Sequence, residues 1–204
     1  MERNRKTIVA IDVGEVNLGF CEIDLSSNRP SNWKRVEIVS KGNAKRQDLY
    51  AGLEKWLQTP EIALALANAS FIVLEDQYKS KYVAMNAFIQ SKHFNKTKLV
   101  NPKQLAKYFN LPQTRKEKKK AAVELVSLNT DLKHFKGKKD DLADAYLLGI
   151  FFLFNLNSEL RKGWNELSAK CSETQTAKVK RPRHDGPAER VERIHTLPDL
   201  PFFF

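Results

Sequence analysis

The chain has 204 residues, a length that fits one domain with a full core plus an extension. Its 35 Lys and Arg residues outnumber its 24 Asp and Glu residues, and the net charge of +11 favours a polyanionic partner, nucleic acid ahead of a membrane surface. Two cysteines are too few for a disulfide framework, and the longest apolar run, Ala145 to Leu156, is shorter than the ~20 residues that cross a bilayer.

These properties argue against a disulfide-stapled secreted module and a membrane-spanning protein. The opening residues MERNRKT lead directly into the first predicted strand, so we expect no signal or transit peptide. The sequence predicts a soluble, intracellular protein that acts in the cytoplasm or the nucleus.

The stretch Ile8–Gly19 (IVAIDVGEVNLG) predicts a buried central strand that ends in an acid. An ionised Asp12 is unfavourable in an apolar core, so we expect its carboxylate to be presented at the strand end. Gly14 and Gly19 bracket a tight turn into a second strand over Leu18–Leu25.

The remaining pattern alternates strands and helices. Further strands are predicted over Trp33–Ser40, after a turn at Asn28–Asn32, over Phe71–Glu75, and around Leu99 and Val100. Helices are predicted over Asp48–Leu57, Pro60–Asn68, Lys81–Phe94 and Pro102–Phe109, from the basic stretch at 113–120 to about Leu128, and from Asp140 onward. This order predicts an α/β domain, residues 1–158, with a mixed sheet and helices on its faces, followed by a basic, largely disordered tail, residues 159–204.

Four acids occupy positions that could meet. Asp12 and Glu75 each end a buried strand, and sites in α/β sheets are usually built at strand ends. Asp141 and Asp144 are three residues apart and share one face of the last helix. Clustered carboxylates repel unless cations neutralise them, and oxygen ligands without His or Cys indicate Mg²⁺ or Mn²⁺. Two such ions ~3.5–4 Å apart would activate a water and stabilise the leaving oxygen of a phosphodiester.

Each acid also has a structural explanation. Asp140 is expected to be the N-cap of the last helix, and the helix dipole alone would explain Asp141. Asp144 lies one turn further into an apolar helix and is harder to explain in this way. Asp76 alternates away from Glu75 and is expected to be solvated, whereas the side chain after it, Gln77, either orients a ligand or caps the strand end.

Three motifs together, IDVGEVNLG, IVLEDQ and KKDDLADAYLLG, resemble those of the RuvC-like Holliday junction resolvases in the RNase H-like superfamily. The branch with the poxvirus and mitochondrial resolvases is the most similar. The resemblance covers about Ile8 to Asn155 and implies an RNase H-like mixed five-stranded sheet with helices on both faces.

The resemblance also implies roles for individual residues. The metal-binding catalytic acids match Asp12, Glu75, Asp141 and Asp144. Asn17 matches a recurring polar position of the first hairpin. Asp140 competes with Asp141 for the third acidic role, and the spacing of three to Asp144 favours Asp141.

A basic stretch, QTRKEKKK at 113–120, opens the penultimate helix, where the helix dipole favours an anion such as a phosphate. Within it, Lys120 resembles the family's lysine near the scissile phosphate. The predicted nucleic-acid contacts beside Asn17 are Arg115, Lys116, Lys118, Lys119, Lys120, Lys138 and Lys139. A solvated charge run is the alternative explanation for any one of these lysines.

The resemblance implies a homodimer that nicks two strands of a four-way DNA junction symmetrically, with the helix after Glu75 at its interface. The final residues Leu197–Phe204 (LPDLPFFF) show the spacing of peptides that dock on sliding clamps, although packing against their own domain is the favoured explanation.

The leading hypothesis is therefore a Mg²⁺-dependent, structure-selective endonuclease. Alternatives are an RNase H-type nuclease that cuts RNA–DNA hybrids and a nucleic-acid-binding protein without catalysis. An actin-like sugar kinase or ATPase, which also uses an Asp-x-Gly hairpin, is argued against by the single-domain length and the 8 glycines.

Overall fold

The structure, a computed structural model, describes residues 6–40 and 45–157. The predicted tail at 159–204, and with it the clamp-like segment Leu197–Phe204, lies outside the described residues. Within the described part, no helix is long and apolar enough to cross a membrane.

One five-stranded mixed sheet forms the centre of the molecule. Its strands are β1 (Thr7–Val13), β2 (Asn17–Asp24), β3 (Pro30–Glu37), β4 (Phe71–Glu75) and β5 (Thr97–Val100). They lie in the order β3-β2-β1-β4-β5. The first three strands pair antiparallel, whereas β4 is parallel to β1 and β5 is parallel to β4. The expected RNase H-like sheet, with the first and fourth strands as neighbours, is confirmed.

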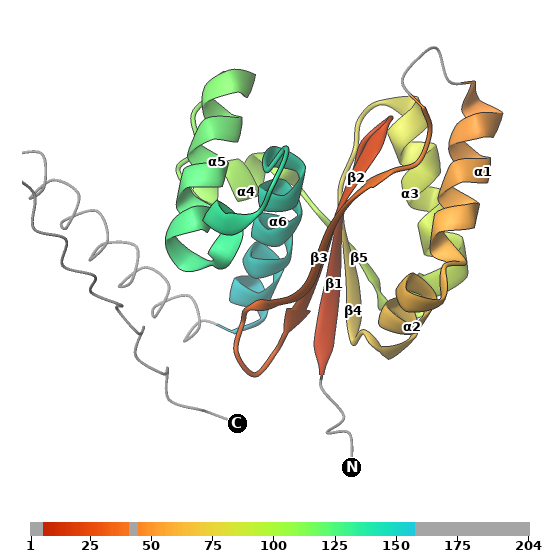
Figure 1. Ribbon diagram of the computed structural model, residues 1–204, viewed down its shortest axis with the longest axis horizontal. Coiled ribbons are helices and arrows are strands. Elements are labelled where there is room, and N and C mark those ends of the chain that lie inside the picture. The colour runs from red at the N-terminus through yellow and green to blue at the C-terminus, as the bar shows by residue number, and fades with distance from the viewer. Residues whose placement is uncertain (1–5, 41–44, 158–204) are drawn as a thin grey trace, which may run out of the picture.

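Helices cover both faces of this sheet, as expected (Figure 1). The first face carries α1 (Arg46–Leu57), α2 (Pro60–Asn68) and α3 (Ser80–His93). The second carries α4 (Pro102–Tyr108), α5 (Arg115–Asn129) and α6 (Asp140–Leu156). Two short 3₁₀ turns, η1 (Phe94–Lys96) and η2 (Asp131–His134), follow α3 and α5.

Alternation along β1 assigns its side chains to two separate cores. Val9 and Ile11 pack with α1, α2 and α3, whereas Ile8 and Ala10 pack with α4, α5 and α6. The period of two then places Asp12 on the same side as Ala10, under α6.

The third strand begins earlier than the sequence pattern predicts. The turn expected over Asn28–Asn32 and the strand over Trp33–Ser40 are both wrong by about three residues, because the chain reverses sooner. The carboxylate of Asp24 accepts a hydrogen bond from the backbone N–H of Ser26 at 2.7 Å, and Asn28 has a φ of +54°. An aspartate that bonds the backbone two residues on closes a tight turn locally, so β3 can start directly after it.

The first turn of α6 lies directly on β2. A Cβ atom added to Gly19 would lie 1.9 Å from the carbonyl oxygen of Asp141, so this contact requires glycine. On the neighbouring strand, the indole N–H of Trp33 donates to the carbonyl of Leu142 at 3.0 Å. The start of α6 is therefore fixed against both β2 and β3.

Gly19→Ala is expected to lower the free energy of unfolding by about 2–3 kcal/mol, because its methyl group collides with backbone that cannot rotate away. Gly149→Ala is the matched control. Its Cβ would meet the end of the Ile23 side chain at 2.5 Å, which can move, and the helix gains up to ~1 kcal/mol from alanine. Urea denaturation measures both values. Equal effects of the two substitutions would contradict the special role of Gly19.

Candidate active site

Two acids lie at the adjacent ends of parallel strands. Ile11 of β1 is paired with Leu74 of β4, and Asp12 and Glu75 are the next residues of their strands. Both carboxylates lie on the face covered by α6, because each is two residues beyond a side chain of that core. The two acids lie close together as expected, because both line one pocket.

The same pocket receives side chains from α5 and α6. It is lined by the acids Asp12, Glu75 and Asp144, the cations Arg115, Lys118 and Lys119, and the apolar residues Leu105 and Leu148. The structure therefore gathers three of the four predicted acids opposite three of the predicted cations of α5. Such a pocket offers negative oxygens on one wall and ammonium or guanidinium groups on the other.

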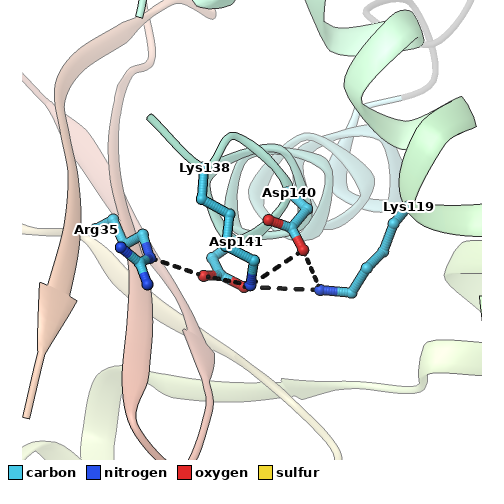
Figure 2. Close-up of polar contacts among 5 residues, drawn as sticks. All are labelled: Arg35, Lys119, Lys138, Asp140 and Asp141. Carbon is cyan, nitrogen blue, oxygen red and sulfur yellow. Dashed lines mark hydrogen bonds and ion pairs between the residues drawn. The ribbon is translucent and has the colours of Figure 1, made fainter. Parts of the chain in front are cut away.

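The acids at the start of α6 are ion-paired beside this pocket (Figure 2). Lys119 of α5 contacts the carboxylate of Asp140, and Lys138 lies 3.2 Å from the same group. Asp141 has Lys138 at 3.1 Å and Arg35 of β3 at 3.1 Å. Figure 2 shows Arg35 approaching from the strands and Lys119 from the opposite side.

Asp140 is not the N-cap that the sequence predicts. Lys139 occupies the N-cap position with helical backbone angles, φ −98° and ψ −18°, and Asp140 is the first helical residue. Its carboxylate turns toward Lys119 instead of toward the backbone, because a charged partner outweighs a local cap.

Lys120, predicted near the scissile phosphate, does not line the pocket. Its side chain is 78% exposed and lies 3.8 Å from Glu124, one turn along α5. Its neighbours Lys118 and Lys119 point into the pocket instead, because each residue rotates the helix by about 100°.

The other predicted contacts also lie outside the pocket lining. Lys116 is exposed at the start of α5, and Lys139 donates to the carbonyl of Lys133 at 2.8 Å. Asn17 begins β2 with a buried side-chain oxygen that has no hydrogen-bond partner among the described residues.

Three side chains that support the acids were missed or left open by the sequence pattern. Gln77 donates to the carboxylate of Glu75 at 2.9 Å, which resolves its role as a partner of that acid. Asn86 of α3 donates to the carbonyl of Glu75 at 2.7 Å. A lone buried amide on an otherwise apolar helix face was the available signal for Asn86. Arg35 lies within the predicted third strand, but no local pattern indicates that its side chain reaches Asp141 of α6.

Burial and crowding act together on the acids of the pocket. Burial, followed by the charges of Asp144 and Glu75, raises the pKa of Asp12 well above its usual value. Burial raises the pKa of Asp144 to about 6, although Lys119 and Lys118 oppose this rise, and burial also raises the pKa of Glu75. Without a further cation, ionisation of these carboxyl groups therefore costs more in the pocket than in water.

The paired acid at the helix start behaves in the opposite way. Burial opposes its charge, but the hydrogen bonds and charges of Lys119 and Lys138 hold the pKa of Asp140 below its usual range. These opposite shifts separate Asp140, which has two close lysines, from the pocket acids, whose pKa values are raised by burial.

The donor set fits a hard divalent cation. Every acidic side chain of the pocket offers carboxylate oxygen, which suits Mg²⁺ and Mn²⁺. One oxygen of Asp140 is buried without a hydrogen-bond partner in the part of the chain that the structure describes. Within residues 6–40 and 45–157, no three His, Cys, Asp or Glu side chains stand close enough to hold an ion as placed. Ion binding would therefore require side-chain rotation.

The structure combines a mixed five-stranded sheet with acids at the ends of two neighbouring strands and on its last helix, which is the arrangement expected of an RNase H-like nuclease. Residues 6–157 match the family described as Poxvirus A22 protein. The chain belongs to this family, the poxvirus Holliday junction resolvases. The family resemblance identified from the three motifs is thereby confirmed.

Two solved structures of RuvC from Thermus thermophilus are similar to the chain. One, in complex with a Holliday junction substrate, is 11% identical, with 71% of this chain and 90% of that chain covered and a TM-score of 0.46. The other is 11% identical, with 70% and 90% covered and a TM-score of 0.48. No curated protein matches the chain.

The raised pKa of Asp144 predicts the pH dependence of stability in EDTA. Its pKa of about 6 in the folded chain exceeds the unfolded value of ~3.9. The stability that the bound proton contributes is therefore fully present below a pH of ~3.9 and is lost as the pH rises through about 6. Asp144→Asn should therefore be more stable than the natural chain at pH 7.5, by roughly 1–3 kcal/mol, and the difference should shrink toward pH 4.5. Thermal melts across this range measure it. A variant that is less stable at pH 7.5 would contradict the assignment.

Proposed function

We propose that the chain resolves four-way DNA junctions by hydrolysis of one phosphodiester in each of two opposite strands. Two Mg²⁺ ions per pocket, for which Mn²⁺ would substitute, are proposed to be bound by Asp12, Glu75, Asp141 and Asp144. The single observation that carries this proposal is the shared pocket of strand-end acids and α5 cations.

The acids have distinct parts in this proposal. Asp12 and Glu75 extend from the two central strands and present oxygens from a rigid base, while Asp144 faces them from α6. Gln77 and Asn86 hold the side chain and the backbone of Glu75 in place. Bound Mg²⁺ ions would supply Lewis-acid chemistry, lowering the pKa of the attacking water and stabilising the leaving oxygen.

The start of α5 is proposed to hold the phosphate. Arg115 and Lys118 line the pocket at the N-terminal turn of a 15-residue helix, where backbone N–H groups and the helix dipole also favour an anion. Lys118 takes the position near the scissile phosphate that the resemblance gave to Lys120. The exposed side chain of Lys120 would contact the DNA backbone outside the pocket.

A four-way junction has two equivalent strands to cut, so we propose that two copies of the chain act together. The helix α3 is the proposed interface, and the 46% exposure of Val83 supports it. Lys116, Lys138 and Lys139 are proposed to contact the DNA arms. A sliding clamp remains a proposed partner of the segment Leu197–Phe204.

Asp12→Asn is expected to reduce junction cleavage at least ~100-fold while junction binding is kept, because loss of a metal ligand should exceed the effect of losing a partner of a ligand. Asp76→Asn is the matched control, because Asp76 lies beside Glu75 but does not line the pocket. Cleavage is measured on labelled four-way junction, duplex and RNA–DNA hybrid, each with Mg²⁺ or with EDTA. Gel shifts in Ca²⁺ measure binding.

Cleavage of the junction in Mg²⁺ but not in EDTA supports the proposal. Preferential cleavage of the hybrid would favour an RNase H-type nuclease instead, and binding without any cleavage would favour a non-catalytic protein. Unchanged cleavage by Asp12→Asn would remove this acid from the site.

A second comparison tests the phosphate contact. Lys118→Ala should lower the rate of junction cleavage by about 10²-fold, because a cation aimed at the reacting phosphate is lost. Lys120→Ala should change the rate by less than about threefold, because an exposed contact contributes little. Each variant removes one positive charge from the same helix, so a general effect of lost charge would be equal in the two variants. Single-turnover cleavage at saturating protein measures the rates, and a larger effect of Lys120→Ala would contradict the assignment.

A further inference from the structure

Three cations lie around the carboxylate of Asp141, and the two nearest, Arg35 and Lys138, are of different kinds, while Lys119 lies further away at 3.7 Å (Figure 2). The Nε atom of Arg35 donates to one oxygen at 3.1 Å. The ammonium group of Lys138 lies 3.1 Å from the other oxygen and 3.2 Å from the first. Asp141 itself is buried, with a side chain 12% exposed.

Arg35 belongs to the sheet, on the edge strand β3. Arg35 of β3 is paired with Gly19 of β2, and Gly19 is paired with Asp12 of β1. The three residues therefore form one row across the sheet. Gly19 has no side chain, so the space above it is filled by the start of α6, with Asp141. The guanidinium group thus extends to Asp141 from the row that contains Asp12.

Lys138 is attached differently. It precedes α6, outside any helix or strand, and its side chain is 50% exposed. Its ammonium group also lies 3.2 Å from Asp140, so Lys138 shares with Lys119 the neutralisation of both acids of the first helical turn. A lysine on a flexible stem can leave such a position more readily than a guanidinium anchored on a strand.

From these contacts we infer that the two cations have opposite effects on metal binding at Asp141. Arg35 is a positioning residue that fixes the orientation of the carboxylate. Lys138 stands in for the metal ion and leaves the carboxylate when the ion binds. The inference rests on the proposed function, because it takes Asp141 as a metal ligand.

The signs of the two effects separate this inference from simpler explanations. If both cations acted only by charge, removing either one would strengthen metal binding, because repulsion of the ion would fall. If both cations were only structural, removing either one would change the stability of the fold but not the affinity for the metal ion. Opposite signs arise only when one cation orients the ligand and the other competes for it.

The experiment measures Mn²⁺ binding to the full chain by isothermal titration calorimetry without DNA. Arg35→Met keeps the aliphatic stem and should weaken binding by about tenfold, as loss of a group that orients a ligand does. Lys138→Met should strengthen binding by about two- to threefold, because a half-exposed competing charge is lost. Arg35→Lys should recover part of the affinity.

Lys34→Met is the matched control. Lys34 directly precedes Arg35 in the same strand, and its ammonium group contacts Glu61 of α2 on the other face of the sheet. It should leave Mn²⁺ affinity unchanged although it removes the same charge. Thermal melts in EDTA establish that each variant folds, and Arg35→Gln replaces Arg35→Met should that variant be unfolded.

Tighter binding by both Arg35→Met and Lys138→Met, or an unchanged affinity in both, overturns the inference. Asp12→Asn distinguishes this failure from failure of the proposed function. If Asp12→Asn loses Mn²⁺ binding while the Arg35 variants keep it, only the inference fails. If Asp12→Asn binds Mn²⁺ as tightly as the natural chain, the proposed metal site fails as well.

Discussion

The close contact between the backbone of α6 and Gly19 is the constraint on which the candidate site depends. The carbonyl of Asp141 lies where a side chain of β2 would stand, so the helix approaches the sheet more closely than any residue but glycine permits. This approach brings the acidic first turn of α6 beside the row from Arg35 to Asp12. A side chain at this one position would separate the helical acids from the strand acids.

Bringing five acids together creates repulsion, and the structure limits it in two ways. Asp140 and Asp141 have lysine and arginine partners within 3.2 Å. The pocket acids are instead shifted toward their protonated forms, with the pKa of Asp144 raised to about 6. The folded chain can therefore form without an ion, while the raised pKa values keep the pocket acids responsive to a divalent cation.

The strong local patterns predicted most of the fold and part of the site. Apolar runs that end in an acid identified β1 and β4, and their neighbouring ends brought Asp12 and Glu75 into one pocket. The prediction failed where a tertiary contact decides. An edge strand has weak alternation, so the start of β3 cannot be placed accurately from the sequence. Arg35 lies inside the predicted strand, but its contact with Asp141 joins residues 106 positions apart and leaves no local pattern. In a run of lysines the helical phase cannot be read locally, so the sequence does not indicate that Lys118 lines the pocket while Lys120 is exposed.

The two sides of the pocket differ in how firmly the fold holds them, and this difference fits the proposed function. The strands fix Asp12 and Glu75 through a ladder that continues into the core on both faces of the sheet. The cations of α5 extend on long stems from the start of a helix, where they can follow a phosphate as it enters. Rigid acids suit ions that require fixed ligands, and adaptable cations suit a substrate whose backbone bends at a junction. The chain therefore places acids on the sheet and long-stemmed cations on the helix, and in the proposed function a scissile phosphate would enter between them.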